Sequence, residues 1–279
     1  MRTAALLALF GWVPSFPAFA EPPRTQLSHE EANALIASLL VASPYKLGEA
    51  ARNGHIRYRL TFANPQAHAV PQTGEQRAAE RDGVVVVDIC AGCGEEATPN
   101  DADLQRYRSA NAWVESNDRN IRAFARRHGS GRTIEQRMTR LSAAVRAHMN
   151  GPIDFRRYDS AATAFKSRSG DCTEVALLLA AAARARGIPT RVVYGIAYSS
   201  RFTGKAHVFS PHSWVQAWDG QRWRSYDAGL GHFDAGHIAL AIGDGSAAKL
   251  APAMHAIPGM RIVDAYGVLS VKQAKDFGR

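Results

Sequence analysis

Cysteine is scarce in this chain, and long polar tracts are absent. Only three of the 279 residues are cysteine, at positions 90, 93 and 172, and glycine and proline occur at ordinary frequencies. Without extended polar segments, long disordered regions are not expected. Hydrophobic residues make up 46% of the sequence, so the chain can bury a substantial core, as one large domain or two small ones.

Long hydrophobic runs are also absent beyond the first twenty residues. Residues 1–20 hold one arginine, a short apolar run broken by Pro14 and Pro17, and a small-x-small ending at Ala20. This layout is typical of a secretory signal peptide and is too short and broken for a stable membrane span. The residue directly after the expected cleavage site is Glu21 rather than cysteine, so a lipid anchor is not expected. We therefore expect an exported protein, periplasmic or secreted, after cleavage near Ala20.

A cluster of like charge is missing as well. The formal net charge is +9 and 28 arginines outnumber 6 lysines, but these cations are spread along the chain. Nucleic-acid binding requires a basic stripe or aromatic platforms, so no nucleic-acid partner is expected. The arginine excess either favours association with an anionic cell envelope or is simply a compositional bias on a solvated surface.

Residues 21–110 are predicted to form a small α+β region. Ser28 and Glu31 fit a capping box that begins a helix, which we expect to end at Pro44. Alternating apolar residues at 56–62 and a β-branched run at 84–89 predict two strands. Residues 64–83 between them are rich in proline, glutamine, glycine and charge, which is typical of a long loop.

Residues 111–279 are predicted to form a larger domain in which helices precede an antiparallel sheet. Apolar periodicity predicts helices closed by Gly129 and Gly151, a short helix at 160–166 and a long one from Cys172 to Arg186. Three extended runs follow, at 190–198, 213–218 and 223–227. This order indicates an α+β fold.

Cys172 stands at the start of the long predicted helix, directly after the loop-forming Ser169-Gly170-Asp171. Asp171 is expected to be the N-cap, which places the thiol where the first helical N–H groups point at its sulfur. A helix N-terminus and a nearby imidazolium both lower the pKa of a thiol, and the thiolate is the nucleophile. Cys172 is therefore either a nucleophile or a buried small residue.

Two histidines about forty residues further on are candidates for a general base. His207 falls in a predicted loop, whereas His212 opens an alternating strand that would hold its ring in a fixed orientation. We therefore prefer His212.

A carboxylate is needed to hold the imidazole. Asp219 is explained by the Asp219-Gly220 turn, and Asp227 ends the neighbouring strand. A two-residue turn, with Trp218 facing Gln221, places His212 opposite Asp227. Cys172, His212 and Asp227 are therefore the predicted catalytic triad.

Four blocks occur in order around these residues: G-D-C-T-E, R-A-R-G-I-P-T-R-V-V-Y-G, H-S-W-V-Q-A-W and W-R-S-Y-D-A-G. With the later block D-A-G-H-I-A-L-A-I-G-D-G at 234–245, they resemble the transglutaminase-like superfamily over residues 117–269. The resemblance implies a papain-like α+β core, in which the helix bearing the nucleophilic cysteine packs on an antiparallel sheet, and a Cys-His-Asp triad at Cys172, His212 and Asp227. Residues 21–110 resemble extra segments of exported bacterial members.

The activity implied is acyl transfer from a peptide or glutamine side-chain amide through a thioester on Cys172. We expect hydrolysis, as by a protease or amidase, rather than cross-linking, with a protein or peptide as the substrate. The Cys172 N–H is one expected oxyanion donor. Candidates for the second, each also explained by core packing, are Trp113, Tyr194 and Trp214. No cofactor or metal is expected, because no acidic loop has calcium-ligand spacing.

Two alternatives stay open. Cell-wall amidases with D-C-S-G fit less well, because Thr173 and Glu174 follow the cysteine here. The other is a non-catalytic binding or scaffold module of the cell envelope, which would have no reason to keep all three residue types of the triad.

Cys90 and Cys93 form a separate C-x-x-C at the end of a predicted strand. A zinc site needs about four ligands, and a redox site needs a thioredoxin-like βαβ setting. Neither context is visible, so a structural disulfide is the favoured interpretation.

Overall fold

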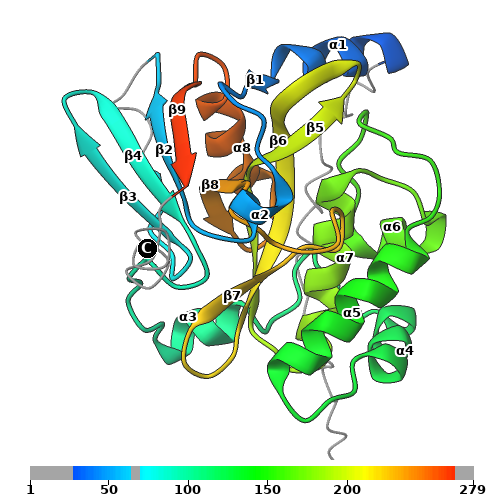
Figure 1. Cartoon of the computed structure of the whole chain (residues 1–279). Helices are drawn as coiled ribbons and strands as arrows, with labels where there is room; N and C mark the ends of the chain where they lie inside the picture. The colour runs from blue at the N-terminus through cyan, green and yellow to red at the C-terminus, as the bar shows by residue number, and fades with distance from the viewer. Residues whose placement is uncertain (1–27, 64–69, 268–279) are drawn as a thin grey trace, which may run out of the picture.

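The computed structural model describes residues 28–63 and 70–267, and the predicted signal peptide lies outside these ranges. Two antiparallel sheets lie side by side, with most of the helices gathered against the larger sheet (Figure 1). The helices are α1 (His29–Ser38), α2 (Glu49–Arg52), α3 (Asp101–Arg106), α4 (Arg119–His128), α5 (Ile134–His148), α6 (Ala161–Ser167), α7 (Cys172–Arg184) and α8 (Ala247–Ala256). The strands are β1 (Val41–Ala42), β2 (Ile56–Thr61), β3 (Gln76–Arg81), β4 (Val84–Ile89), β5 (Thr190–Phe202), β6 (Lys205–Trp218), β7 (Trp223–Tyr226), β8 (His237–Gly243) and β9 (Arg261–Gly267).

The larger sheet has the strand order β1-β6-β5-β8, and β7 also pairs with β6. Helix α7 packs against β5 and β6 on one side and against α4, α5 and α6 on the other (Figure 1). Its central residues, including the run Ala180–Ala183, are fully buried. Alanine has the highest helix propensity and lets neighbouring elements approach closely. The predicted α+β core, with the helix that begins at Cys172 packed on an antiparallel sheet, is confirmed.

The smaller sheet has the order β3-β4-β2-β9 and buries one face, through residues such as Tyr58, Val87 and Ile89. Its last strand, β9, follows α8 and pairs with β2. Conversely, β1 belongs to the larger sheet through its pairing with β6. The chain therefore crosses between the two sheets near both ends, and a domain boundary at residue 110 stays a prediction.

Three local expectations are corrected. Residues 64–83 were expected to be a loop, but β3 occupies Gln76–Arg81. Most of β3 is exposed, as an edge strand allows, so it lacks the apolar alternation that marks a half-buried strand. Helix α1 ends at Ser38 rather than Pro44, because β1 pairs with β6 before the proline is reached. The C-cap of α5 is Met149 rather than Gly151.

The two sheets are joined by buried polar contacts. The Gln76 side chain accepts a hydrogen bond from the Ala239 N–H at 2.8 Å and donates to the Ala239 carbonyl at 3.0 Å. The Tyr58 hydroxyl donates to the Ala235 carbonyl at 2.6 Å. Since Ala235 and Ala239 flank the start of β8, the smaller sheet helps to fix where that strand begins.

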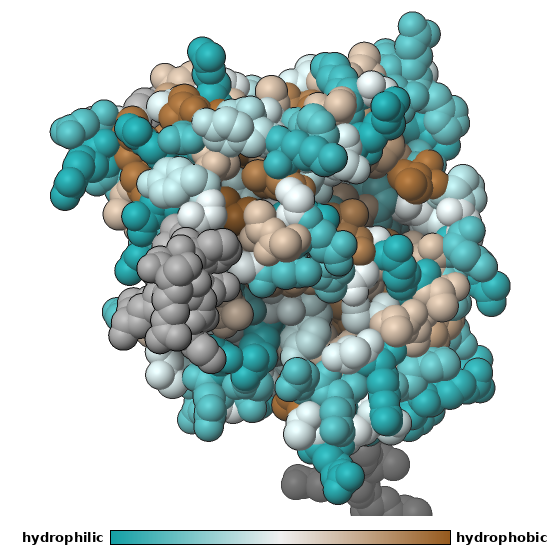
Figure 2. Space-filling model, in the orientation of Figure 1, coloured by the Kyte–Doolittle hydropathy of each residue, from teal (hydrophilic) through white to brown (hydrophobic). Residues whose placement is uncertain are grey.

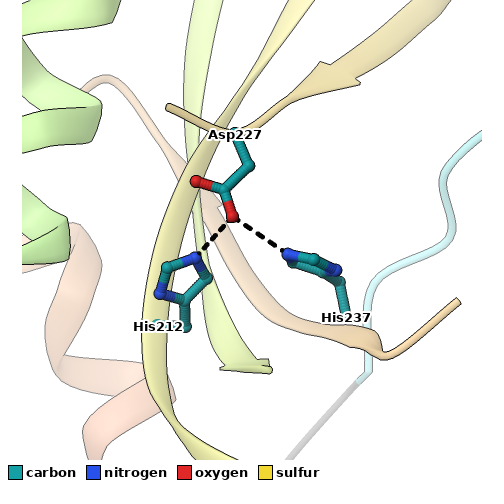
Figure 3. A group of neighbouring side chains, drawn as sticks. All are labelled: His212, Asp227 and His237. Atoms are coloured by element: carbon teal, nitrogen blue, oxygen red, sulfur yellow. Dashed lines mark hydrogen bonds and ion pairs between the residues drawn. The ribbon is translucent and has the colours of Figure 1, made fainter. Parts of the chain in front are cut away.

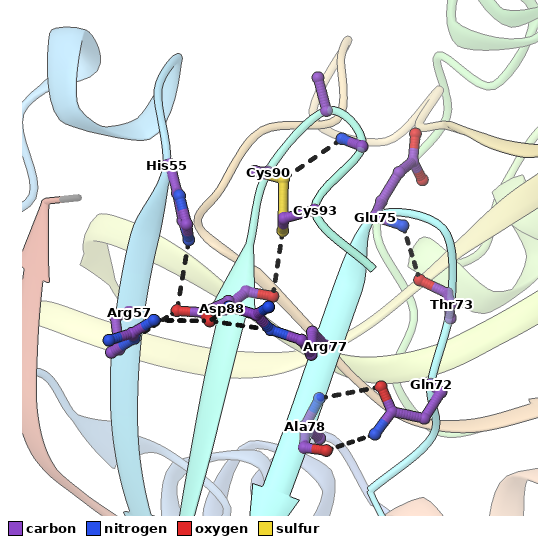
Figure 4. Close-up of a disulfide and its surroundings, with 12 residues drawn as sticks. His55, Arg57, Gln72, Thr73, Glu75, Arg77, Ala78, Asp88, Cys90 and Cys93 are labelled. Atoms are coloured by element: carbon purple, nitrogen blue, oxygen red, sulfur yellow. Dashed lines mark hydrogen bonds and ion pairs between the residues drawn. A yellow bond between two sulfur atoms is a disulfide. The ribbon is translucent and has the colours of Figure 1, made fainter. Parts of the chain in front are cut away.

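A disulfide joins Cys90 and Cys93 just beyond the end of β4 (Figure 4), as predicted, and its structural role stays a prediction. Nearby on β4, the Asp88 carboxylate bonds Arg57 and Arg77 of the two flanking strands. These contacts tie β2, β3 and β4 together at this end of the sheet.

The face of the molecule seen in Figure 2 is mostly hydrophilic, and its hydrophobic residues appear as small separate areas. Among the described helices, none combines the length and the apolar character needed to cross a bilayer.

Candidate active site

An opening in the edge of β6 defines the candidate site. Among the described residues, one edge of β6 pairs with β5, and the other pairs only with β1 at Val208–Phe209 and with β7 at Val215–Trp218. The stretch between them contains His212, which pairs with Gly195 of β5. Cys172, at the N-terminus of α7, lies against this unpaired stretch. Its Sγ is 4.0 Å from the Pro211 carbonyl oxygen and accepts a hydrogen bond from the Ser213 N–H.

The two backbone groups that contact the sulfur belong to the residues on either side of His212. Cys172 and His212 also line the same cavity. The structure therefore brings together the cysteine and the histidine that the sequence analysis singled out.

The start of α7 is fixed by the residues that surround Cys172. Asp171 is the N-cap, its carboxylate accepts the Thr173 N–H at 2.7 Å, and Glu174 completes a capping box by accepting the Asp171 N–H at 2.8 Å. Gly170 has φ +148°, and a Cβ at that position would lie 2.6 Å from Cβ of Glu174. Only glycine allows this close approach to the first helical turn.

The electrostatic environment of Cys172 differs from the expectation. Burial raises the pKa of the thiol well above its ordinary value, and the carboxyl group of Asp171 adds to this increase. The helix N-terminus and the Ser213 N–H act in the opposite direction without overcoming burial. The resting group is therefore a thiol, and a base must remove its proton during attack.

His212 is held by Asp227. Its Nε2 lies 2.8 Å from Oδ2 of Asp227 (Figure 3), and both side chains are almost fully buried. Oδ1 of Asp227 accepts the N–H groups of Gly229 and Leu230 at 2.7 and 3.1 Å. Burial favours the neutral acid, but the two histidines bonded to Asp227 hold the pKa of its carboxyl well below the usual range. With Nε2 engaged, Nδ1 is the nitrogen of His212 left to accept the proton of the thiol.

The hairpin that carries Asp227 differs in detail from the prediction. Trp218 pairs with Trp223 rather than Gln221, so the loop has four residues, from Asp219 to Arg222. The Asp219 carboxylate accepts the N–H groups of Gln221 and Arg222, which is the turn role expected for it. The register shift is two residues, and an even shift keeps each side chain on the same face of the sheet.

One residue of the site was missed by the sequence analysis. His237, the first residue of β8, is 2% exposed, and its Nε2 lies 3.1 Å from the same Oδ2 of Asp227 (Figure 3). On its other side, Nδ1 lies 3.1 Å from Oδ1 of Asp234. Burial opposes a charged ring, but the hydrogen bonds to the two carboxylates outweigh it and raise the pKa of His237 to about 9. The sequence feature that could have identified His237 is a histidine at the start of an apolar strand shortly after Asp227.

The other candidates from the sequence lie apart from this site. His207 contacts the Tyr198 hydroxyl at 2.9 Å and does not line the cavity. The Tyr194 hydroxyl lies 3.2 Å from that of Tyr158, and the Trp214 indole N–H donates to Ser225. Of the described residues that line the cavity, none is Trp113, Tyr194 or Trp214. The structure therefore gives no contact that supports any of these three as the second oxyanion donor, and they stay predictions.

The cavity around Cys172 and His212 has a volume of about 390 Å³. Its rim carries Ile153 and Leu230, which are 68% and 47% exposed. Its remaining apolar side chains include Met149, Phe155, Val175, Tyr198, Phe202 and Pro211. The cavity can therefore receive an apolar side chain beside the thiol.

Among the described residues, one group could hold a metal ion: His212, Asp227 and His237, whose ligand atoms all lie within 4.8 Å of one another. Each of these residues already hydrogen-bonds another member of the group. An ion would take Nε2 of His212 from Asp227 and so remove the contact that orients the ring.

Comparison with known proteins gives a family and several similar folds. The family model described as the transglutaminase-like superfamily matches residues 122–228, a segment that contains Cys172, His212 and Asp227. Similar solved structures include a proposed cysteine protease from Cytophaga hutchinsonii, with 16% identity, 77% of this chain and 86% of that chain covered, and a TM-score of 0.47. The periplasmic domain of TgpA from Pseudomonas aeruginosa gives 16% identity, 76% and 95% coverage, and a TM-score of 0.43.

Red sea bream transglutaminase is also similar, with 11% identity, 70% of this chain and 49% of that chain covered, and a TM-score of 0.36. No curated protein matches the chain. The family-model match confirms the resemblance seen in the sequence, and it includes the whole of α7 and the hairpin of β6 and β7.

Proposed function

The transglutaminase-like superfamily model matches residues 122–228, and from this premise we propose that the chain is a cysteine hydrolase or acyltransferase acting on amide bonds. Cys172 is the nucleophile, His212 the general base and acid, and Asp227 the carboxylate that holds His212. The observation that carries the proposal is the position of the Cys172 sulfur between the Pro211 carbonyl and the Ser213 N–H, beside a histidine already bonded to a buried aspartate.

The first step follows from the protonated thiol. As Sγ of Cys172 bonds to the carbonyl carbon of the amide, its proton passes to Nδ1 of His212 and the carbonyl oxygen becomes an oxyanion. In the described part of the chain the Cys172 N–H has no acceptor, so it is available to that oxyanion. The C–N bond then breaks, and the leaving nitrogen takes the proton from His212.

The thioester is then resolved by a second acyl transfer. Water gives its proton to His212 and attacks the thioester carbon, which releases the acid and restores the thiol. An amine in place of water gives a new amide. We propose hydrolysis as the main outcome. We propose a protein or peptide as the substrate, because the small apolar cavity suits a side chain next to the scissile amide.

Acyl-enzyme trapping tests this proposal. We expect p-nitrophenyl acetate to add one acetyl group to Cys172, visible by intact mass and removed by hydroxylamine. Cys172→Ala should not acylate, and His212→Ala should acylate at least about 100-fold more slowly, the usual scale of lost general-base catalysis. Acylation of Cys172 at the same rate without His212 would reject the triad and favour a binding module.

Once the acyl-enzyme is established, its fate separates the two activities. A labelled primary amine is added in increasing concentration, and the products are resolved by mass. Hydrolysis predicts free acid as the main product even at high amine concentration, and amide as the main product would instead identify an acyltransferase.

Export is also proposed. The Cys90–Cys93 disulfide supports an oxidising compartment, and the first twenty residues have the composition of a signal peptide. Expression in a bacterial host should yield a periplasmic or secreted protein whose intact mass corresponds to a chain that begins at Glu21. An uncleaved protein in the cytoplasm would reject this part of the proposal.

A further inference from the structure

The carboxylate of Asp227 serves two histidines at once. Its Oδ2 lies 2.8 Å from Nε2 of His212 and 3.1 Å from Nε2 of His237 (Figure 3). Asp227 follows the last residue of β7, so no strand pairing of its own fixes its direction. By contrast, His237 lies at the start of β8, a paired strand. His237 thus gives Asp227 a contact to a rigid element.

His237 is itself anchored from the opposite side. Its Nδ1 lies 3.1 Å from Oδ1 of Asp234, and Asp234 forms an ion pair with Arg52 of α2. The Ala235 N–H also donates to the Arg52 carbonyl at 2.7 Å. A continuous series of contacts therefore runs from α2 of the N-terminal region to His212.

The charges along this series alternate. The carboxylates of Asp227 and Asp234 are acceptors, so His237 donates to both of them only when both of its ring nitrogens carry protons. An unprotonated Nδ1 would instead accept the Asp234 N–H, which lies 3.3 Å away. The raised pKa of His237 agrees with that arrangement. A buried carboxylate is costly unless it is paired, and His237 and Arg52 provide that pairing.

We propose that His237 is a positioning residue, which holds Asp227 against His212 and is held in turn by Asp234 and Arg52. This inference rests on the proposed function. His237, Asp234 and Arg52 all lie outside the segment that the family model matches. The positioning role is thus proposed from the contacts of these residues in this structure, beyond the segment that contains the three residues of the proposed triad.

Two amide substitutions separate the two contacts of His237. In His237→Gln the terminal amide nitrogen reaches the place of Nε2 and keeps a donor to Asp227. In His237→Asn the shorter amide takes the place of Nδ1, keeps a donor to Asp234 and loses Asp227. We expect His237→Asn to lower kcat for acylation about 10- to 100-fold with little change in KM, the usual effect of losing an outer partner of a site. His237→Gln should keep most of the wild-type rate.

A purely structural role of His237 would not change how the acylation rate depends on pH, so this pH profile is the deciding measurement. The titratable groups that face His237 are Asp227, Asp234 and His212, and Arg52, His232 and Tyr58 lie around Asp234. We expect the acidic midpoint of the acylation rate to shift in His237→Asn and to stay near the wild-type value in His237→Gln. His148→Asn is the matched control: His148 bonds the Phe165 carbonyl at 2.8 Å and does not line the cavity.

The outcomes separate this inference from the proposed function. A wild-type rate and pH profile in His237→Asn, with Cys172→Ala inactive, would overturn the positioning role alone. Equal losses in the Asn and Gln variants would also overturn it, because they would show that the Asp227 contact is not what matters. Unimpaired acylation in His212→Ala would overturn the proposed function itself.

If His237→Asn does not fold, Asp234→Asn tests the same role through the residue that holds His237. The neutral amide cannot hold a doubly protonated His237 as Asp234 does. We expect a smaller loss of kcat than the loss from Asp227→Asn, with the acidic midpoint shifted in the same direction. A wild-type profile in Asp234→Asn would overturn the series of contacts.

Discussion

The side chains of Asp171 and Glu174 are hydrogen-bonded to each other at the start of α7. Glu174 is 1% exposed, and burial together with the charge of Asp171 raises its pKa to about 9. Its Oε1 accepts the Asp159 N–H and its Oε2 accepts the Asp171 N–H, both at 2.8 Å. The Glu174 carboxyl beside Cys172 is therefore mostly neutral at neutral pH.

The neutral state of Glu174 predicts how stability depends on pH. A carboxyl whose pKa is raised by folding stabilises the protein fully below the unfolded value, near 4.5, and this contribution is lost as pH rises through the folded value. The free energy of unfolding should thus decline from about pH 5 to about pH 9. In Glu174→Gln this decline should be shallower.

Denaturant unfolding at several pH values checks this expectation. His237 also has a raised pKa and loses stabilisation over the upper part of the same range in both proteins, so the difference between their slopes is the measured quantity. Glu135→Gln is the control, since Glu135 is exposed near the start of α5. Parallel curves for wild type and Glu174→Gln would show that Glu174 is ionised.

How far the sequence predicted the site can be seen from its three proposed catalytic residues. The N-cap at Asp171 is a local signal, because side-chain capping involves residues two or three apart. The hairpin that brings Asp227 to His212 was also readable, although its turn is two residues longer than predicted. An error of an even number of residues left the faces of both strands unchanged.

His237 and the opening in β6 could not be read in the same way. One end of the opening is set by β1, which lies more than 160 residues earlier in the sequence and pairs with Val208–Phe209. The position of His237 depends on the pairing of β8 with β5, which contains a register shift at Tyr194/Gly195. Both are long-range pairings with no local signal. Edge strand β3 was missed for a related reason, since an exposed edge does not need apolar alternation.

Gly195 links that register shift to the site. A Cβ at this position would lie 2.0 Å from the Ile238 carbonyl oxygen and 3.0 Å from Cα of Ala239. Both atoms belong to the backbone of β8, so the strand that carries His237 would have to move. We expect Gly195→Ala to lower the free energy of unfolding by at least about 3 kcal/mol and to reduce acylation of Cys172.

Thermal and denaturant unfolding measure the first effect, and the p-nitrophenyl acetate assay measures the second. Gly74→Ala is the control, because its Cβ would meet nothing closer than the Trp223 carbonyl oxygen at 3.8 Å. A Gly195→Ala protein as stable and active as Gly74→Ala would contradict the close approach of β5 and β8.

The disulfide is predicted to stabilise the fold without taking part in the chemistry. Cys90 and Cys93 are three residues apart, and closing so small a loop is worth about 2 kcal/mol in the chain-entropy model. The double variant Cys90→Ser/Cys93→Ser should lose about that much unfolding free energy and keep the acylation rate of Cys172. A large loss of acylation in a folded double variant would instead support a redox role.

The apolar cavity predicts a preference among substrates. The rings of Phe155 and Phe202 pack edge to face, with centroids 6.3 Å apart, and both line the cavity that contains Cys172. Phe202 lies at the tip of the long β5–β6 hairpin, so its removal opens the cavity without changing the strands that carry His212. Phe202→Ala should raise KM about 10-fold for peptides with a bulky apolar residue beside the scissile amide.

Peptides with alanine at that place should change much less, because they make little contact with the aromatic pair. Acylation by p-nitrophenyl acetate provides the internal control, since its small acyl group needs only Cys172 and His212. If Phe202→Ala slows all three substrates equally, the ring acts on the catalytic residues rather than on the substrate. If it slows none, the bound side chain lies elsewhere, and Ile153 and Leu230 on the exposed rim become the residues to vary.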